Sequence, residues 1–171
     1  MKKLLVLFTV FCLTAALRAQ NNAVDEMFRK YQEREGFSVI TISSGLFRMI
    51  ANLDTDNEDA DNIIHNLRSI RILSVKDSLL NKGLNFYNEL TKKLNISAYE
   101  ELMVVKEGQD VTKFLVKHNG DRISELLVIA GGPGGNSLIS IQGNLSLKNI
   151  SELSKTEMEG LNKLEKIEKK E

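Results

Sequence analysis

The sequence has little of the material from which proteins build metal sites and disulfide frameworks. Its 171 residues include one cysteine, two histidines, one proline and no tryptophan. One thiol and two imidazoles leave few ligands for a protein-built zinc site, and a single cysteine cannot form a disulfide within the chain. The 23 basic and 23 acidic residues cancel, which argues against a nucleic-acid-binding protein because such proteins need a basic surface.

What the sequence does contain is typical of an ordinary globular protein. Hydrophobic residues make up 42% of the chain and charged residues 27%, so the composition is neither that of a disordered chain nor that of a coiled coil. A chain of this length has room for one domain with short tails, and not comfortably for two.

The first twenty residues differ from the rest of the chain. Lys2 and Lys3 form a positive start, and residues 4–13 are apolar except for Thr9. Small residues follow this run: Ala15, Ala16 and Ala19. This order is typical of a secretory signal peptide, and a run of about ten residues is too short to cross a bilayer, which takes about twenty. We expect residues 1–19 to be a signal peptide, with cleavage after Ala19 preferred to cleavage after Ala16.

The lone cysteine, Cys12, lies inside the apolar run and is preceded by Phe11. The lipidated cysteine of a bacterial lipoprotein follows the apolar run and small residues, so the sequence does not favour a lipoprotein. Removal of residues 1–19 would take away Cys12 and three basic residues, leaving a net charge of −3. The remaining chain would have no disulfide and would depend on its core alone. We therefore expect an exported protein, either periplasmic or secreted.

Apolar residues at helical spacing predict the helices. The first helical face consists of Val24, Met27, Phe28 and Tyr31. Gly36 is placed to end that helix. Further amphipathic stretches predict helices at 44–53, 60–67, 77–94 and 146–153. In the long helix at 77–94, Gly83 lies on the apolar face, where it would permit close packing at a cost in helix propensity.

Runs rich in β-branched and aromatic residues predict six strands. These runs lie at 37–42, 69–75, 101–106, 112–117, 122–130 and 136–143. Ile70 and Ile72 are expected to be buried, with Leu73 as a further candidate. Asn119-Gly120 is a pair typical of a two-residue type I′ hairpin. The last four strands are therefore expected to form an antiparallel meander.

Helices cluster early in the chain and strands run together late, which indicates an α+β fold rather than a doubly wound sheet. We expect a largely antiparallel or mixed sheet with helices packed on one face and a C-terminal four-stranded meander. The strand at 69–75, the helix at 77–94 and the strand at 101–106 could form one parallel crossover. A single domain would cover residues 20–155, and residues 156–171 would be a charged tail that is helical or frayed.

Several stretches, taken in their order along the chain, carry a family resemblance. They are residues 35–43 (EGFSVITIS), 46–50 (LFRMI), 69–73 (SIRIL), 99–102 (YEEL), 139–144 (ISIQGN) and 150–153 (ISEL). The chain resembles the DUF4252 family of exported Bacteroidetes proteins over roughly residues 24–155. The resemblance implies an envelope or secreted protein of a Gram-negative bacterium, and it supplies no catalytic or ligand residues to carry over. Some members look like lipoproteins, and the placement of Cys12 departs from that pattern.

The acidic stretch at 54–61 is the first candidate for chemistry. Asp54, Asp56 and Glu58 could begin a calcium loop, but an EF-hand needs Gly at its sixth position and Glu at its twelfth. Asp59 and His65 stand at those two positions. The EF-hand interpretation fails, and a solvated loop before a helix is favoured over a looser calcium site.

The other polar motifs are equally weak. The glycines within 131–135 lack the Lys-Ser/Thr pair and the following helix of a phosphate loop, so a mobile hairpin loop is favoured over an anion-binding nest. His65 and His118 are not accompanied by a Gly-x-Ser-x-Gly elbow, and neither is favoured as a catalytic base. Paired carboxylates could serve a glycosidase, but the aromatic platforms usual in sugar sites are scarce.

We therefore predict no catalytic, cofactor-binding or metal-ligating residue and no cofactor. The expected function is that of a non-catalytic interaction module, with another envelope protein or a second copy as its partner, and with no nucleic acid and no transmembrane segment in the mature chain. The expected contact surfaces are the free edge of the meander and the C-terminal helix. Two alternatives stay open: a small-ligand protein or enzyme whose site is built from scattered residues, and a periplasmic accessory in envelope-stress signalling.

Overall fold

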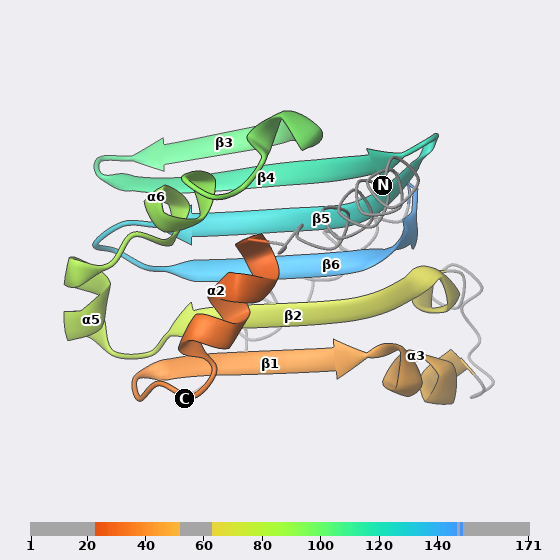
Figure 1. Ribbon diagram of the computed structural model, residues 1–171, viewed down its shortest axis with the longest axis horizontal. Coiled ribbons are helices and arrows are strands. Elements are labelled where there is room, and N and C mark those ends of the chain that lie inside the picture. Colours follow the sequence, from red (N-terminus) through yellow and green to blue (C-terminus); the bar gives the residue numbers. More distant parts are fainter. Residues whose placement is uncertain (1–22, 52–62, 147, 149–171) are drawn as a thin grey trace, which may run out of the picture.

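The computed structural model describes residues 23–51, 63–146 and 148. Six strands form one sheet in the order β1-β2-β6-β5-β4-β3, and each neighbouring pair is antiparallel (Figure 1). The strands are β1 (Phe37–Ser43), β2 (Leu67–Val75), β3 (Glu100–Glu107), β4 (Asp110–Asn119), β5 (Arg122–Gly131) and β6 (Ser137–Leu145). The predicted α+β class is confirmed. The predicted signal peptide, the acidic stretch at 54–61 and the tail at 156–171 lie outside the described residues.

Short helices surround this sheet. They are α2 (Ala23–Tyr31), α3 (Ser44–Ala51), α5 (Ser78–Gly83), α6 (Phe86–Thr91) and the 3-10 helix η2 (Ile96–Ala98). Residues 63–66 are also helical, and β2 begins directly after them. The helix predicted at 146–153 lies mostly outside the described residues.

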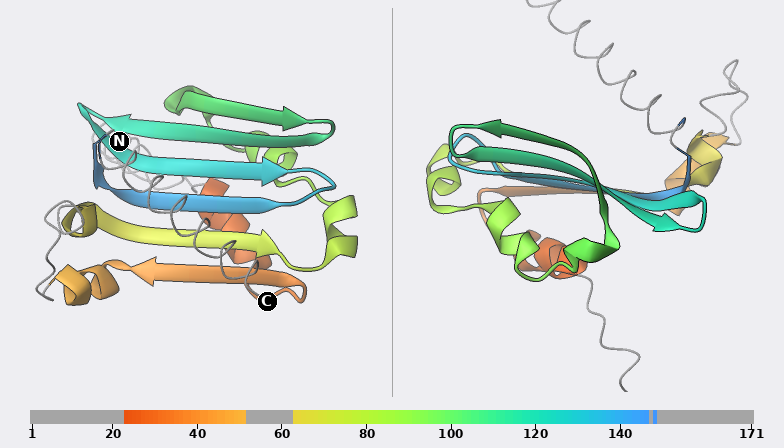
Figure 2. Two further views of the ribbon diagram at one scale, coloured as in Figure 1. Left: turned by 180° about the vertical axis from the view of Figure 1, so that it is seen from behind. Right: turned by 90° about the horizontal axis from the view of Figure 1, so that it is seen from above.

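The two faces of the sheet carry separate hydrophobic clusters, because successive side chains of a strand point to opposite faces. On the first face, which we call the covered face, α2 and α6 pack over Leu73, Leu127 and Leu138 (Figures 1 and 2). On the second, the open face, α3 and residues 63–66 contact one end of the sheet, where Phe47 and Ile63 belong to a cluster with Leu126 and Leu145.

The meander of β3, β4, β5 and β6 is confirmed, but one of its turns differs from the prediction. Asn119 pairs with Arg122, so the central residues of the turn are Gly120 and Asp121. Gly120 has φ +62°, and positive φ occurs only at glycines among the described residues. A type I′ turn needs positive φ at both central positions, whereas glycine at the first position alone fits a type II′ turn. The predicted type I′ turn is therefore wrong.

The predicted parallel crossover from β2 to β3 is also wrong. β2 pairs with β1 and β6, and in the described sheet β3 lies at the far edge with β4 as its one neighbour. The segment from α5 to η2 carries the chain across the covered face to that edge, as Figure 1 shows. The meander then fills the sheet back toward β2, so that β6 becomes its antiparallel neighbour.

α2 forms as its sequence pattern predicts. Val24, Met27, Phe28 and Tyr31 are all buried against the covered face. Acidic residues lie in its first turn and basic residues in its last, where each complements the helix dipole. The helix ends at Tyr31 rather than at Gly36, which instead turns the chain into β1 with φ +82°.

The single helix predicted at 77–94 is two helices, α5 and α6, separated by Leu84 and Asn85. The Asn85 side chain accepts a hydrogen bond from the Asn88 amide (2.8 Å), so a polar residue inside the pattern acts as an N-cap. Gly83 ends α5 and has no neighbour within 4 Å of an added Cβ, so it does not serve close packing. The break turns Phe86 into the core, where it is fully buried.

The buried side chain of Asn136, just before β6, satisfies the backbone groups that this break exposes. Its Oδ1 accepts from the Phe86 amide (2.7 Å). Its Nδ2 lies within hydrogen-bonding distance of the carbonyl oxygens of Leu84 (3.3 Å) and Gly132 (3.0 Å). A buried backbone group without a partner is destabilising, so Asn136 is what makes the interrupted helix compatible with burial.

The burial predicted for β2 is correct at one of three residues. Leu73 is fully buried on the covered face, whereas Ile70 and Ile72 are only partly buried because they lie on the open face. The strand therefore follows the two-residue alternation of a sheet with one well-covered side.

Candidate functional site

Three of the four glycines within 131–135 lie close against neighbouring residues, and Gly135 does not. The Gly134 amide donates a hydrogen bond to Asp110 Oδ1 (2.9 Å). A Cβ added at Gly131 would collide with the Tyr87 backbone, and one at Gly132 would collide with Asp110. The anion that faces this turn is thus a carboxylate of the chain itself. The predicted hairpin loop connects β5 to β6.

The two histidines lie at exposed positions. His118 Nε2 lies 2.8 Å from Glu100 Oε2, and these two residues belong to neighbouring strands at the β3 edge. His65 is exposed on helical residues 63–66. Within the described ranges, no group of three or more His, Cys, Asp or Glu side chains could hold a metal ion. The candidate calcium ligands at 54–58 lie outside those ranges.

Glu125 on β5 is the one charged side chain that the described fold buries, with 4% of its surface exposed. Its carboxylate accepts hydrogen bonds from the Tyr99 hydroxyl (2.8 Å), the Ser140 hydroxyl (2.7 Å) and the Gln142 amide (3.3 Å). Burial and the negative charge of Glu125 raise the pKa of Tyr99 well above its usual range. Tyr99 therefore stays a hydrogen-bond donor, and the cluster ties the start of β3 to β5 and β6.

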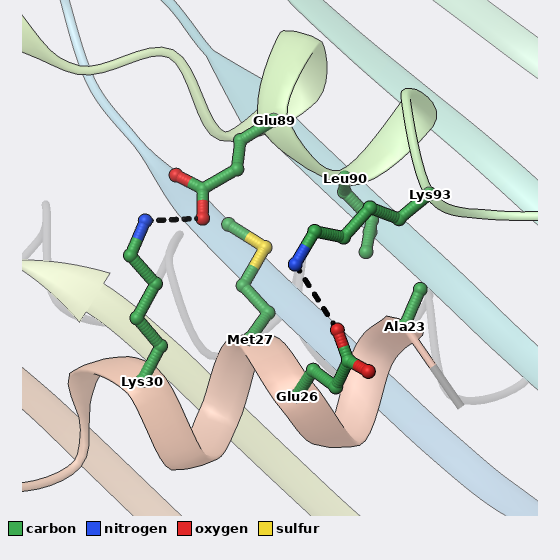
Figure 3. A pocket seen from close by; sticks show the side chains of 7 residues that line it. All are labelled: Ala23, Glu26, Met27, Lys30, Glu89, Leu90 and Lys93. Carbon is green, nitrogen blue, oxygen red and sulfur yellow. Dashed lines mark hydrogen bonds and ion pairs between the residues drawn. The ribbon is translucent and has the colours of Figure 1, made fainter. Parts of the chain in front are cut away.

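A cavity of about 240 Å³ lies between α2 and α6 (Figure 3). It is lined by Ala23, Glu26, Met27, Lys30, Glu89, Leu90 and Lys93. Ion pairs join its two sides, Lys30 to Glu89 (2.6 Å) and Lys93 to Glu26 (3.1 Å). The charged groups at this cavity are thus paired with one another, and its volume is below the 300–1,000 Å³ or so usual for ligand sites.

Hydrogen bonding keeps the first of these ion pairs charged. Burial pushes the pKa of Glu89 upward, but hydrogen bonds from Lys30 and from the Tyr31 hydroxyl (2.7 Å) outweigh it and lower the pKa overall. Burial lowers the pKa of Lys30, but the same contacts outweigh burial and raise the pKa overall. The arrangement therefore clamps α2 to α6.

The two edges of the sheet differ in charge. β3, the free edge of the meander, carries four charged residues among eight: Glu100, Glu101, Lys106 and Glu107. β1, the other edge, has the sequence FSVITIS and carries none. Natural sheets usually protect their edges from pairing with other chains by placing charges there. By this criterion β1 is the unprotected edge.

An open groove lies at the start of β1. Its volume is about 500 Å³, and its lining consists of Arg34, Glu35, Phe37, Leu79, Leu80, Gly83 and Leu84. Leu79 is 74% exposed, more than any other large hydrophobic side chain in the described part of the fold. The groove and the β1 edge are continuous through Phe37, which belongs to both. We call this combined surface the β1 edge site.

A family model described as "Domain of unknown function (DUF4252)" matches residues 31–153, which include all six strands. The chain belongs to the DUF4252 family. The resemblance expected from the sequence is thereby confirmed. No curated protein and no solved structure matches this DUF4252 chain. In the described part of the DUF4252 fold, no helix is long and apolar enough to span a membrane.

Sequence reasoning missed three features of this DUF4252 fold: Asn136, Glu125 and the β1 edge site. Asn136 and Glu125 act through partners far along the chain, and such neighbours are not visible in a local pattern. The β1 edge did leave a signal, since a β-rich run of seven residues without a charge or proline is unusual for an edge strand. The sequence does not show that this strand lies at an edge.

Proposed function

We propose that this DUF4252 protein is a non-catalytic interaction module, exported to the envelope of a Gram-negative bacterium of the Bacteroidetes group, which binds an extended segment of another envelope protein at the β1 edge site. The charged start, apolar run and small residues at 1–19 support export. The family resemblance supports the organism group.

The observation that carries the proposal is the unprotected edge strand. Among the described residues, β1 pairs with β2 alone, so no described strand pairs with the backbone N–H and C=O groups along its other side. Such groups are a template for an added strand. Strand addition gains its affinity from main-chain hydrogen bonds and its specificity from pockets for alternate side chains. The groove beside Phe37, with Leu79 and Leu80 at its rim, offers such a pocket to an apolar side chain.

The polar groups of the fold support binding rather than catalysis, because they are used within the protein. Glu125 accepts from three side chains, and Lys30 and Glu89 neutralise each other. A catalytic acid or base must instead reach a substrate proton.

Site-specific photocrosslinking in cells of the native host tests the proposal. A photoreactive residue would replace Ile40, at the β1 edge, or Met103, at the β3 edge, in the full-length exported chain. These positions form a matched pair because their side chains are 49% and 47% exposed and lie at opposite ends of one row across the sheet.

We expect a discrete adduct with another envelope protein from position 40, at least about five times as intense as any adduct from position 103. A second chain carries the photoreactive group at Thr41 and should also form the adduct. Adding Ile40→Lys to this second chain should abolish its adduct, since a lysine at an edge opposes strand pairing. An adduct from position 103 alone would move the site to the meander edge, and no adduct at either position would overturn the proposal.

A further inference from the structure

Exposed apolar side chains gather along the β1 edge of the sheet. In the described part of the fold, nine large hydrophobic side chains are exposed. Five of them lie on β1 or on the helices near its two ends: Ile40, Leu46, Met49, Leu79 and Leu80. The other four lie in η2 and β3, at the edge that charged residues protect. Apolar side chains that gather on one part of a surface mark a place where another protein binds.

The two ends of β1 differ in shape. α3 begins at the residue after β1 and exposes Leu46 and Met49, whereas α5 lies near the start of the strand (Figure 1). That start has the apolar groove beside Phe37, with Leu79 of α5 in its lining. The exposed side chains of α3 and the groove are therefore separated by the length of β1, about 24 Å for seven residues at about 3.4 Å each.

Antiparallel pairing of two β1 strands would bring these unlike ends together. A two-fold axis at Ile40 would set Ile40 opposite its own copy and Phe37 opposite Ser43 of the second copy. The start of each strand would then lie beside the end of the other, and α3 of one copy would lie beside the groove of the other. Because a two-fold interface uses the same surface on both subunits, this contact would be made twice.

The charges at the two ends of β1 are also compatible with this arrangement. Arg48 is exposed on α3, and Glu35 is exposed in the lining of the groove. Arg34, the cation of the same lining, lies 5.5 Å from the centre of the Tyr31 ring. Two-fold pairing would therefore bring Arg48 toward the carboxylate of the second copy. It would set no charge between the paired strands, since β1 carries none.

Pairing at β1 would also end with two copies. The described sheet has β1 at one edge and β3 at the other, so a β1 dimer would have two β3 strands at its outer edges. Four of the eight residues of β3 are charged, which opposes further strand pairing. A closed dimer is thus favoured over a growing chain of copies.

We propose that two copies pair through β1 in an antiparallel arrangement centred on Ile40, and that this dimer closes the β1 edge site until another protein displaces one copy. The regulatory part of this inference rests on the proposed function, because the second copy and the segment of an envelope protein use the same backbone groups of β1. The dimer itself does not depend on that function. The fraction of chain with a free edge then limits the apparent affinity for the envelope protein.

Cysteines on β1 test the pairing in the full-length exported chain carrying Cys12→Ala. Residues directly opposite each other in an antiparallel pair have Cα atoms about 4.5–5.5 Å apart, a separation that a disulfide can span. Ile40→Cys should therefore give disulfide-linked dimers under mild oxidation. Ile42→Cys is the control, because each residue 42 would lie about 14 Å along the strands from its copy.

We expect at least about five times more disulfide-linked dimer from Ile40→Cys than from Ile42→Cys at the same protein concentration. Equal yields would indicate random collision and would overturn the proposed pairing. Light scattering should show that the parent chain is a dimer at the concentration of the disulfide assay. A monomer would equally overturn the proposal.

A second variant tests the contact between α3 and the groove. Met49→Glu would place a carboxylate beside Glu35 and the apolar lining of the second copy, and it should raise the Kd of the dimer at least about tenfold. Sedimentation equilibrium measures this Kd. Met103→Glu, at the β3 edge, is the control and should leave the Kd unchanged. A Kd of Met49→Glu equal to that of the parent would contradict the proposed contact.

A third measurement separates the dimer from the proposed function. A chain with Ile40→Cys and a photoreactive group at Thr41 is irradiated in cells of the native host, with and without prior reduction. The oxidised dimer should give no adduct with another envelope protein, whereas the reduced chain should give one. An adduct from the oxidised dimer would overturn the regulatory role. No such adduct in either state, from a chain that is a dimer by light scattering, would support the dimer and overturn the proposed function.

Discussion

The two faces of the sheet are built by different means. On the covered face, fully buried leucines and isoleucines lie among directional polar contacts from Glu125 and Asn136. Arg71 adds another such contact, because its guanidinium lies 2.7 Å from Asp25 and 4.5 Å from the centre of the Phe28 ring. The open face, by contrast, presents a row of apolar side chains across the strands.

This difference separates stability from specificity. Apolar packing is non-directional, so a row such as Ile72, Ile139 and Val128 would accept a covering element in several orientations. Hydrogen bonds from Asn136 to the interrupted helix have one productive geometry, and a misplaced helix would leave them unmade. The covered face therefore selects one arrangement of α2 and α6, whereas the open face supplies only affinity for an apolar partner.

The largest expected effect compares two neighbouring residues of β5 that point to opposite faces. Leu127→Ala should lower the free energy of unfolding by about 3–4 kcal/mol, because Leu127 is fully buried on the covered face. Val128→Ala should lower it by about 1 kcal/mol, since Val128 is only partly buried on the open face. Urea unfolding of the two variants measures both values, and equal losses would refute the contrast between the faces.

Asn136→Ala is expected to have the next largest effect, a loss of about 3 kcal/mol. The substitution leaves the Phe86 amide and the Leu84 carbonyl without their partner in a buried position. Ser137→Ala, one residue later, is the control and should change the free energy of unfolding by no more than about 0.5 kcal/mol. A loss below about 1 kcal/mol for Asn136→Ala would show that water replaces the side chain and that the break does not depend on it.

These contrasts also explain how much of the fold could be predicted from the sequence. The periodicity of residues 24–31 and the run of late strands were sufficient to predict α2, the meander and the α+β class. They could not reveal that Asn85 and Asn136 interrupt the helix at 77–94, because the decisive hydrogen bond joins residues fifty positions apart. Strand order was likewise hidden, since β-propensity says which residues form a strand and not which strand lies beside it.

The candidate site was even less accessible to sequence reasoning. The sequence predicts the free edge of the meander and the C-terminal helix as contact surfaces, because an unpaired edge strand is a template for pairing. Only the sheet order shows that β1 forms the opposite edge and that it carries no charge. The sequence predicts a loop at 131–135 because the Lys-Ser/Thr pair and the following helix of a phosphate loop are missing. It does not show that Asp110 accepts a hydrogen bond from the Gly134 amide.

A smaller and pH-dependent effect is expected for Tyr99→Phe, which removes one hydrogen bond from Glu125. At pH 7 the loss in unfolding free energy should be about 1 kcal/mol. The pKa of Tyr99 is raised in the folded chain, so this residue stabilises the fold below its unfolded pKa of about 10 and the contribution declines as the pH rises above that value. As the pH rises from about 9 to about 11, a range that brackets the unfolded pKa, the variant should therefore lose less stability than the parent. Parallel curves over that range would contradict this role.

The smallest expected effect lies at the rim of the covered face, where Lys30 pairs with Glu89. Glu89→Gln should lower the free energy of unfolding by only about 0.5 kcal/mol at pH 7, because both side chains are partly exposed to solvent. The pKa of Glu89 is lowered in the folded chain, so the carboxylate stabilises the fold above its unfolded pKa of about 4.3 and this contribution disappears as the pH falls through the lower folded value.

The difference between the parent and Glu89→Gln should therefore close as the pH falls from about 6 to about 3. Glu33→Gln, at an exposed position just after α2, serves as the control and should follow the parent curve. A loss of more than about 2 kcal/mol for Glu89→Gln at pH 7 would mean that the clamp between α2 and α6 is electrostatic rather than apolar. The specificity of the covered face would then depend on charge pairs as well as on buried hydrogen bonds.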